Sequence, residues 1–569
     1  MEIVVTSSPH RSAVFSLADD IVERDARSDP LFATESGITQ YDHLLPDFSP
    51  QRTLDNIAST QEYLVALSGL SPLDDIDRIA VSVMEERLRA RLTLLESGEL
   101  SRVFSVLSSP VFSIREVFEL MGSESDDQLV TIVQRLRQIR PSLESWRVTL
   151  EELAGNNELP PRRQVMGVAE QAATYASGSY VAFAQRVAPK AGAESELVAA
   201  ARDADAACGE LSAWMIKVIA PQSIEKDATG IDRYRAWSQY WNGATLDLDE
   251  LYAWGYADLR RINARMWKIA RELAPEATTL IEVAQHLDAD PARAIIGTDE
   301  LLKRLISFTD EAVARLNGVH FDIDERIRFC DARLAPEGSA AAPYYIPPSE
   351  DLTRPGTTWF PTLGATTFSW WSHASTWYHE GVPGLHLQCA TSIIEADRQS
   401  RFHRLEAWTS GHGEGWALYA ERLMDELGFF SDLGDELGFL ACQALRAARV
   451  MVDIGLHLEL KAPEDLGELA DLGDCSGRVW NAAMVVAVLE EFAIQEHEMS
   501  VSEVDRYLGL PGQAISYKVG ERVWMRSRED AKSRLGIDFS LKKFHAFALA
   551  LGPMDLDLFE KELSAWTGE

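Results

Sequence analysis

The chain has 569 residues, of which 46% are hydrophobic and 25% are charged, so it can bury a large core and is not disordered by composition. Its 54 basic and 89 acidic residues give a formal charge of −35, which repels phosphate backbones and argues against nucleic-acid binding. No uncharged apolar run approaches the roughly 20 residues that cross a bilayer, so no membrane partner is expected.

The cysteines favour a reducing compartment. There are five, scattered along the chain and never spaced as C-x-x-C. This pattern argues against a disulfide framework and against a cysteine-ligated metal site. The N-terminal residues also lack the long apolar region of a signal peptide. We therefore predict a cytoplasmic protein.

Helical periodicity dominates the chain. Residues 1–50 are predicted to form a short helix around Ser12–Arg27 and then irregular chain, packed on the body of the protein. From 51 to 320, Leu, Val and Ile recur at three- and four-residue spacings, which predicts a helical half. The clearest helical runs are residues 82–100, 126–153 and 299–318. The same periodicity resumes near residue 374, so residues 321–569 are expected to form a second half of one interlocked body.

The segment between these helical regions differs in character. Residues 320–329 alternate apolar and polar side chains, as a strand does. Residues 331–361 are rich in Pro and Gly, yet they contain Tyr344, Tyr345, Trp359 and Phe360. A solvated linker would waste the apolar surface of these aromatic rings. An ordered loop or β-hairpin near a functional site is therefore favoured over a linker.

Histidines are concentrated in one window. Residues 373–412 contain five of the 12 histidines, where an even spread would place about one. They are His373, His379, His386, His403 and His412. Carboxylates lie between and just beyond them, and imidazole and carboxylate are the ligands that zinc accepts when thiolates are absent. This window therefore predicts a zinc site.

His379 and Glu380 form the first half of an H-E-x-x-H signature, in which two histidines lie one helical turn apart and bind zinc. The position of the second histidine is Pro383, and the next histidine is His386. In an unbroken helix, seven residues separate two side chains by about 10 Å, which is too far for a shared zinc. Pro383-Gly384 could distort the helix and bring the two imidazoles together. This pairing is a hypothesis.

The third expected ligand is Glu414, at the start of a helical run over residues 411–423. Two histidines and one glutamate form a known catalytic zinc arrangement that leaves a position for water. Glu421 lies seven residues later on the same face and is expected to orient a histidine behind the metal. Glu380 is expected to take the proton of the zinc-bound water. One Zn²⁺ per chain is predicted.

Four segments carry a family resemblance. YHEGVPGLHLQ (378–388) and EGWALYAERL (414–423) resemble the signature motifs of the bacterial family called domain of unknown function 885. PYYIPPSEDLTRPGTTWF (343–360) and QAISYKVGERVWMRSRED (513–530) resemble further motifs of that family. Its members are similar to helical gluzincin metallopeptidases of the thimet oligopeptidase and neurolysin type. The resemblance implies a mostly α fold, a large elongated helical bundle with a deep central cleft, and short peptides as substrates.

The resemblance also assigns roles by position. Tyr517 would steady a tetrahedral intermediate through its hydroxyl. Arg522 and Arg526 would bind a substrate carboxylate. Tyr345, in the run before the site, is assigned to substrate binding, and His412 is assigned to the layer behind the ligands.

One departure from the family pattern bears on function. The family usually shows P-G-H-H, whereas this chain has Pro383-Gly384-Leu385-His386. If the zinc ligand is the second of these histidines, His386, nothing is lost, whereas if it is the first, Leu385 would abolish zinc binding. We favour the second because the rest of the motif is intact. The predicted function is zinc-dependent hydrolysis of peptide bonds in short peptides. The alternative is a catalytically inactive, metal-free helical binding protein, and a di-iron bundle is disfavoured because two Glu-x-x-His pairs are not found.

Overall fold

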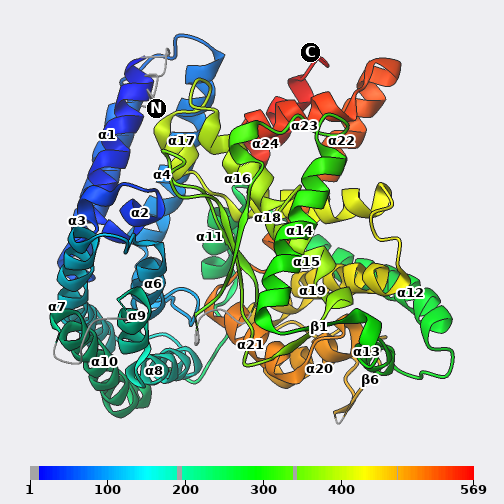
Figure 1. Cartoon of the computed structure of the whole chain (residues 1–569), viewed down its shortest axis with the longest axis horizontal. Helices are drawn as coiled ribbons and strands as arrows, with labels where there is room; N and C mark the ends of the chain where they lie inside the picture. The colour runs from blue at the N-terminus through cyan, green and yellow to red at the C-terminus, as the bar shows by residue number, and fades with distance from the viewer. Residues whose placement is uncertain (1–11, 189–194, 337–341, 471) are drawn as a thin grey trace. The chain divides into compact units, whose positions relative to one another are not determined.

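The computed structural model describes residues 12–188, 195–336, 342–470 and 472–569. Helices dominate these residues and the strands are short (Figure 1), which confirms the predicted mostly α fold. The chain divides into two compact units. The first comprises Met1–Asp227, Ala335–Ala340 and Pro348–Arg354, and the second comprises Ala228–Leu334, Ala341–Pro347 and Pro355–Glu569. The first unit thus ends near residue 227, whereas the sequence places a change of character near residue 320.

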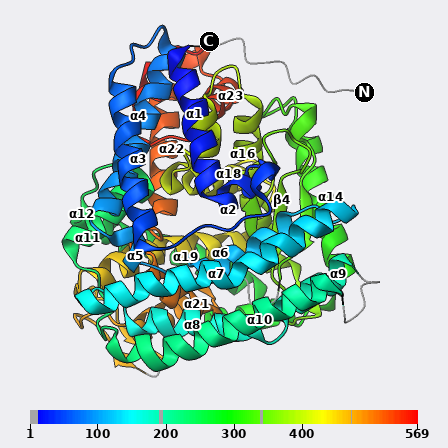
Figure 2. The ribbon, with the colours of Figure 1, turned by 90° about the vertical axis from the view of Figure 1, so that its left-hand side faces the viewer.

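The first unit is a helical array, and Figure 2 shows its long helices α7, α8 and α10 side by side. Its helices are α1 (Ala13–Ser28), α2 (Pro30–Glu35), α3 (Pro50–Ser68), α4 (Asp75–Glu96), α5 (Glu99–Arg102), α6 (Pro110–Val117), α7 (Asp126–Asn156), α8 (Arg162–Ala176), α9 (Ser179–Val187) and α10 (Glu196–Trp214). The predicted helices near 12–27, 82–100 and 126–153 are confirmed as α1, α4 and α7. A capping box between Ser125 and Gln128 explains where α7 begins.

The second unit contains all the predicted site residues. Its helices are α11 (Ile231–Asn242), α12 (Leu248–Leu273), α13 (Leu280–Asp288), α14 (Thr298–Leu316), α15 (Ala374–Glu380), α16 (Leu385–Ile394), α17 (Arg401–Leu405), α18 (Ser410–Glu426), α19 (Leu433–His457), α20 (Ala482–Ala493), α21 (His497–Gly509), α22 (Ser516–Leu535), α23 (Leu541–Ala550) and α24 (Leu556–Ala565). Among these helices, α14 confirms the helix predicted over 299–318.

Short strands lie in the Pro- and Gly-rich segment, as expected. They include β2 (Asp331–Leu334), β3 (Tyr344–Ile346) and β4 (Thr357–Phe360), in the order β2-β4-β3, with β2 parallel and β3 antiparallel to β4. The strands β1 (Ala294–Ile296) and β5 (Thr367–Ser369) pair separately, as do β6 (Glu468–Leu469) and β7 (Gly473–Asp474). The strand predicted over 320–329 is wrong. Asp324 accepts a hydrogen bond from the Arg326 amide and starts a 3₁₀ turn, Glu325–Ile327.

Glycines set the close packing of α18 on α22. A Cβ atom placed on Gly520 would lie 1.8 Å from the Gly411 carbonyl oxygen, and one on Gly415 would lie 2.4 Å from the Gly520 Cα. No larger residue fits at Gly415 or Gly520 unless the two helices separate. This contact holds Glu414 of α18 and Tyr517 of α22 in the same region of the second unit.

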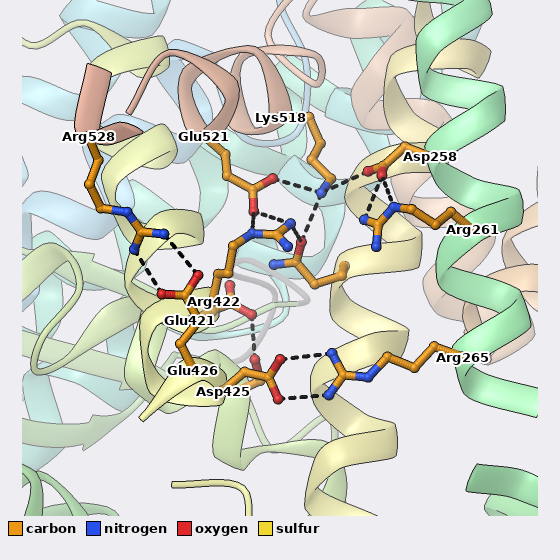
Figure 3. Close-up of polar contacts among 12 residues, drawn as sticks. Asp258, Arg261, Arg265, Glu421, Arg422, Asp425, Glu426, Lys518, Glu521 and Arg528 are labelled. Carbon is orange, nitrogen blue, oxygen red and sulfur yellow. Dashed lines mark hydrogen bonds and ion pairs between the residues drawn. The ribbon is translucent and has the colours of Figure 1, made fainter. Parts of the chain in front are cut away.

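Buried ion pairs also hold α22 in place. Lys518 is 1% exposed, and its Nζ lies 3.0 Å from Asp258 on α12 and 2.7 Å from Glu521. Arg422 of α18 donates to the other oxygen of Glu521 at 2.6 Å. Figure 3 shows Lys518 between Asp258 and Glu521, with Arg422 beside them. The network therefore links α12, α18 and α22 behind the site.

Candidate functional site

The centre of the candidate site is His379, near the end of α15. Its Nδ1 lies 2.8 Å from Oε1 of Glu421, and its Nε2 lies 3.0 Å from Oε2 of Glu414. Glu414 and Glu421 lie two turns apart on one face of α18, and the two ring nitrogens point to opposite sides of the imidazole. One imidazole therefore bridges both carboxylates, and it donates to both only as the imidazolium.

The charges of these three residues support one another. Burial lowers the pKa of His379, but its hydrogen bonds with Glu414 and Glu421 outweigh this effect and raise the pKa to about 9. Burial raises the pKa of each glutamate, yet His379 holds the pKa of Glu414 below its usual value, and Arg446 together with His379 does so for Glu421. The side chain of Glu414 is 14% exposed and that of Glu421 is fully buried. Glu414 is therefore the carboxylate that a ligand can reach.

Glu380 is a buried carboxyl next to this group. The residue is 6% exposed, and its Oε2 is buried without a hydrogen-bond partner among the described residues. Burial raises the pKa of Glu380 to about 8, with Glu414 adding to the increase and His379 opposing it. At neutral pH this carboxyl is mostly protonated, so it can donate a hydrogen bond to a carbonyl oxygen.

We expect the Glu380→Gln substitution to stabilise the protein more at pH 9 than at pH 6. The folded protein keeps the proton on Glu380 up to about pH 8, whereas the unfolded chain loses it near the ordinary pKa of 4.5. The folded state therefore binds more protons in this window, and its stability falls as the pH rises through it. Glutamine has no charge to bury. The melting temperatures of the wild-type and Glu380→Gln proteins at pH 6 and pH 9 check this prediction. An equal difference between the two proteins at both pH values would contradict it.

A backbone break separates α15 from α16. The Gly384 amide donates to the Tyr378 carbonyl at 3.1 Å, six residues back instead of the four of a regular helix. A Cβ atom on Gly384 would lie 2.0 Å from the His379 carbonyl oxygen, so only glycine allows this approach. The distortion expected at Pro383-Gly384 is thus present, and it begins α16 close to His379.

His386 does not join His379. Its Nε2 lies 2.9 Å from the Ile327 carbonyl oxygen, and its Nδ1 lies 3.0 Å from the Tyr345 hydroxyl. Because a carbonyl only accepts, Nε2 carries the proton and Nδ1 accepts from Tyr345. Burial lowers the pKa of His386 to about 4. His386 is therefore a neutral, fully paired imidazole that holds α16 to the segment around β3.

Leu385 and Cys389 lie close together on α16. They lie four residues apart and share one side of the helix. Burial raises the pKa of the Cys389 thiol, and the negative charges of Glu414 and Glu380 add to the increase, so the thiol is near both. Leu385 is 7% exposed. This side of α16 therefore carries a buried hydrocarbon one turn before the Cys389 thiol.

The residues do not fit a three-ligand zinc site as they lie. Two zinc ligands in a tetrahedral site lie about 3.4 Å apart, which is close to the separation of His379 Nε2 and Glu414 Oε2. The third predicted ligand, His386, has both nitrogens engaged elsewhere. Among the described residues, no group of three or more His, Cys, Asp or Glu side chains is placed to hold a metal ion. The ligand set of His379, His386 and Glu414 stays a prediction.

Tyr517 adjoins the centre of the site. Its ring stacks on His379 with the centroids 5.9 Å apart, and its hydroxyl hydrogen-bonds with Glu414. Arg506 donates to the same hydroxyl at 3.1 Å, and the Arg449 guanidinium lies 4.8 Å from the centre of the ring. The hydroxyl is thus placed between a carboxylate and a cation.

Sequence reasoning missed the arginines Arg446, Arg449 and Arg506. The first two lie on α19, where nearly every residue from 437 to 457 is buried. A helix that is apolar all round is a core helix. An arginine in such a helix must be buried and must find a partner. The arginines within this apolar stretch were therefore the sequence signal of a buried polar site.

Three other predicted residues lie elsewhere. Arg522 and Arg526 are about 140° and 180° around α22 from Tyr517, in ion pairs with Glu250 and Glu560. The ring of His412 packs against Trp524 and Phe559, and Gln388 lies 3.2 Å from its Nδ1. Burial lowers the pKa of His412 to about 3. The structure therefore does not bring Arg522, Arg526 or His412 to His379.

The family model described as "Bacterial protein of unknown function (DUF885)" matches residues 30–563. Two solved structures are similar in fold. "The putative lipoprotein from Colwellia psychrerythraea" is 19% identical with a TM-score of 0.81, and the match covers 97% of this chain and 98% of that one. "A putative lipoprotein of unknown function from Shewanella oneidensis" is 16% identical with a TM-score of 0.70, covering 97% and 100%. No curated protein matches the sequence.

These likenesses bear on the fold alone, because both identities are low. Within the described part of the chain, no helix combines the length and the apolar character that crossing a membrane requires. The predicted cytoplasmic location stays a prediction.

Proposed function

The chain belongs to the DUF885 family of bacterial proteins of unknown function, and we propose that it binds short peptides at the buried site around His379 and Glu414 without hydrolysing them through zinc. The observation that carries this proposal is the position of His386 and Leu385. His386 is fully paired with Ile327 and Tyr345, and the residue before it is the buried hydrocarbon side chain of Leu385. Neither residue 385 nor residue 386 therefore offers a free third ligand as the residues lie.

The remaining groups suit peptide binding. Glu380 can donate a hydrogen bond from its protonated carboxyl to a peptide carbonyl oxygen, and the partly exposed Glu414 can accept from a peptide amide or amine. The Tyr517 hydroxyl offers a further polar contact. The choice of a peptide as the ligand rests on the expected similarity of this family to helical gluzincin peptidases of the thimet oligopeptidase and neurolysin type.

Zinc-dependent hydrolysis of short peptides is the second candidate. The separation of 3.0 Å between His379 Nε2 and Glu414 Oε2, with Glu421 behind the imidazole, favours it. Such a carboxylate–histidine pair is the usual support of a zinc-bound histidine. This candidate requires His386 to leave both of its present partners, or a third ligand to come from elsewhere. In it, Glu380 and Tyr517 would keep the catalytic roles that the sequence predicts.

Two measurements on the same purified protein separate the candidates. After incubation with Zn²⁺ and desalting, elemental analysis should find far less than one zinc per chain. Mixed dipeptides to tetrapeptides should raise the melting temperature, and mass spectrometry should recover them uncleaved. The Glu414→Gln variant should lose the thermal shift. Close to one zinc per chain together with cleaved peptides would establish the second candidate, and no shift with any peptide would contradict the proposal.

A further inference from the structure

Arg446 is a buried cation that has no carboxylate hydrogen-bonded to it among the described residues. It is 7% exposed, and among the described residues its hydrogen bonds go only to Cys442, whose carbonyl oxygen lies 3.3 Å from Nη1. Its Nε has no hydrogen-bond partner at all. Arg449, one turn further along α19, is bound instead by Glu503 at 3.0 and 2.7 Å. The charge of Glu421 acts on Arg446, but no carboxylate takes up its N–H donors among the described residues. A buried donor without a partner is costly, so the position of Arg446 suits an anionic ligand.

Arg446 lies beside the candidate site. Its positive charge acts on Glu380, Glu421 and Tyr517, which are the acidic and phenolic groups of that site. Arg446, Glu380 and Tyr517 each keep between 6% and 8% of their surface exposed. Arg446 is also tied to the helix of His379, because its hydrogen-bond partner Cys442 contacts Thr376 of α15 with a separation of 3.7 Å between Sγ and Oγ1.

Two neighbouring arginines add positive charge but are already engaged. Arg449 binds Glu503, and Arg506 binds Glu503, Gln513 and Tyr517. Glu503 is thus shared by two guanidinium groups, which leaves the arginine group with net positive charge. Arg446 is the member of this group whose donors are not taken up by a carboxylate.

We propose that Arg446 binds the C-terminal carboxylate of the peptide, so that the site selects short peptides with a free C-terminus. The inference rests on the proposed peptide binding and names the class of ligand. A guanidinium matches a carboxylate with parallel N–H donors, and this pairing is strongest where water is excluded. Arg449 and Arg506 raise the local positive potential, and Tyr517 lies between them and Glu414.

Isothermal titration with L-alanyl-L-alanyl-L-alanine and with its C-terminal amide tests the inference. The wild-type protein should bind the free acid about ten- to a hundredfold more tightly than the amide. Arg446→Met should bind both peptides with the affinity of the amide. Arg446→Lys, which keeps the charge but not the planar donors, should fall between the two. Arg260→Met is a matched control, because Arg260 pairs with Asp465 at the surface with 61% of each side chain exposed.

Each outcome has a distinct meaning. Equal affinity of the wild-type protein for acid and amide would overturn the inference and leave the proposed peptide binding intact. No binding of either peptide would overturn both. A preference for the acid that survives in a folded Arg446→Met protein would overturn the assignment to Arg446. The acid-to-amide ratio of the wild-type protein decides the ligand class even if Arg446→Met does not fold.

Discussion

The Leu385→His variant is expected to gain a zinc site. An imidazole at position 385 would directly follow Gly384, whose backbone lies against the His379 carbonyl at the start of α16. Together with His379 and Glu414 it would complete three ligands, and Glu421 already orients His379 from behind. We expect zinc affinity to rise by about three orders of magnitude, or about 4 kcal/mol. Isothermal titration with Zn²⁺ near pH 8 measures the change.

The controls separate a real site from surface binding. Leu385→Gln introduces a polar side chain of similar size without an imidazole and should bind zinc no better than the wild-type protein. His386→Ala should leave the zinc affinity of the Leu385→His protein largely unchanged, because His386 stays with Ile327 and Tyr345. A folded Leu385→His protein with the zinc affinity of the wild-type protein would contradict the expectation that residue 385 lies within reach of a zinc ion held by His379 and Glu414. Loss of zinc binding in the His386→Ala control would return His386 to the ligand set.

The sequence predicted most helices because their signals are local. Apolar residues at three- and four-residue spacings and caps such as Ser125 lie within the elements that they define. The strand predicted over 320–329 failed because alternation also fits a loop that turns at Asp324. The division of the chain near residue 227 could not be read from periodicity, since helical patterns continue on both sides of it. It depends on which helices share a core.

In the candidate site too, local sequence signals were predictive and long-range contacts were not. Glu414 and Glu421 share one face of a helix by their spacing, and zinc-ligand chemistry predicted that His379 meets them, as it does. The orientation of His386 could not, because Ile327 and Tyr345 precede it by 59 and 41 residues and belong to a different part of the unit. Arg522 and Arg526 were chosen for their charge and motif, whereas their position around α22 turns them away from Tyr517.

The Lys518→Met substitution is expected to destabilise the second unit by about 3–5 kcal/mol. Lys518 is 1% exposed and neutralises Asp258 and Glu521, which are 9% and 3% exposed. Methionine fills the space of the alkyl chain but leaves two buried carboxylates with one cation fewer. Arg261 and Arg422 still pair with them and limit the loss. Chemical denaturation followed by tryptophan fluorescence, or the shift in melting temperature, gives the size of the effect.

A matched exposed lysine shows whether burial is the cause. Lys303 pairs with Glu300 at 2.7 Å, the same separation as between Lys518 and Glu521, but its side chain is 71% exposed. Lys303→Met should leave the stability almost unchanged, because an exposed ion pair gains little over the separately hydrated charges. Equal losses of stability in the two variants would mean that the buried ion pairs of Lys518 contribute no more than an exposed ion pair. A large loss in Lys518→Met alone would show that burial makes the ion pairs between α12 and α22 important for stability.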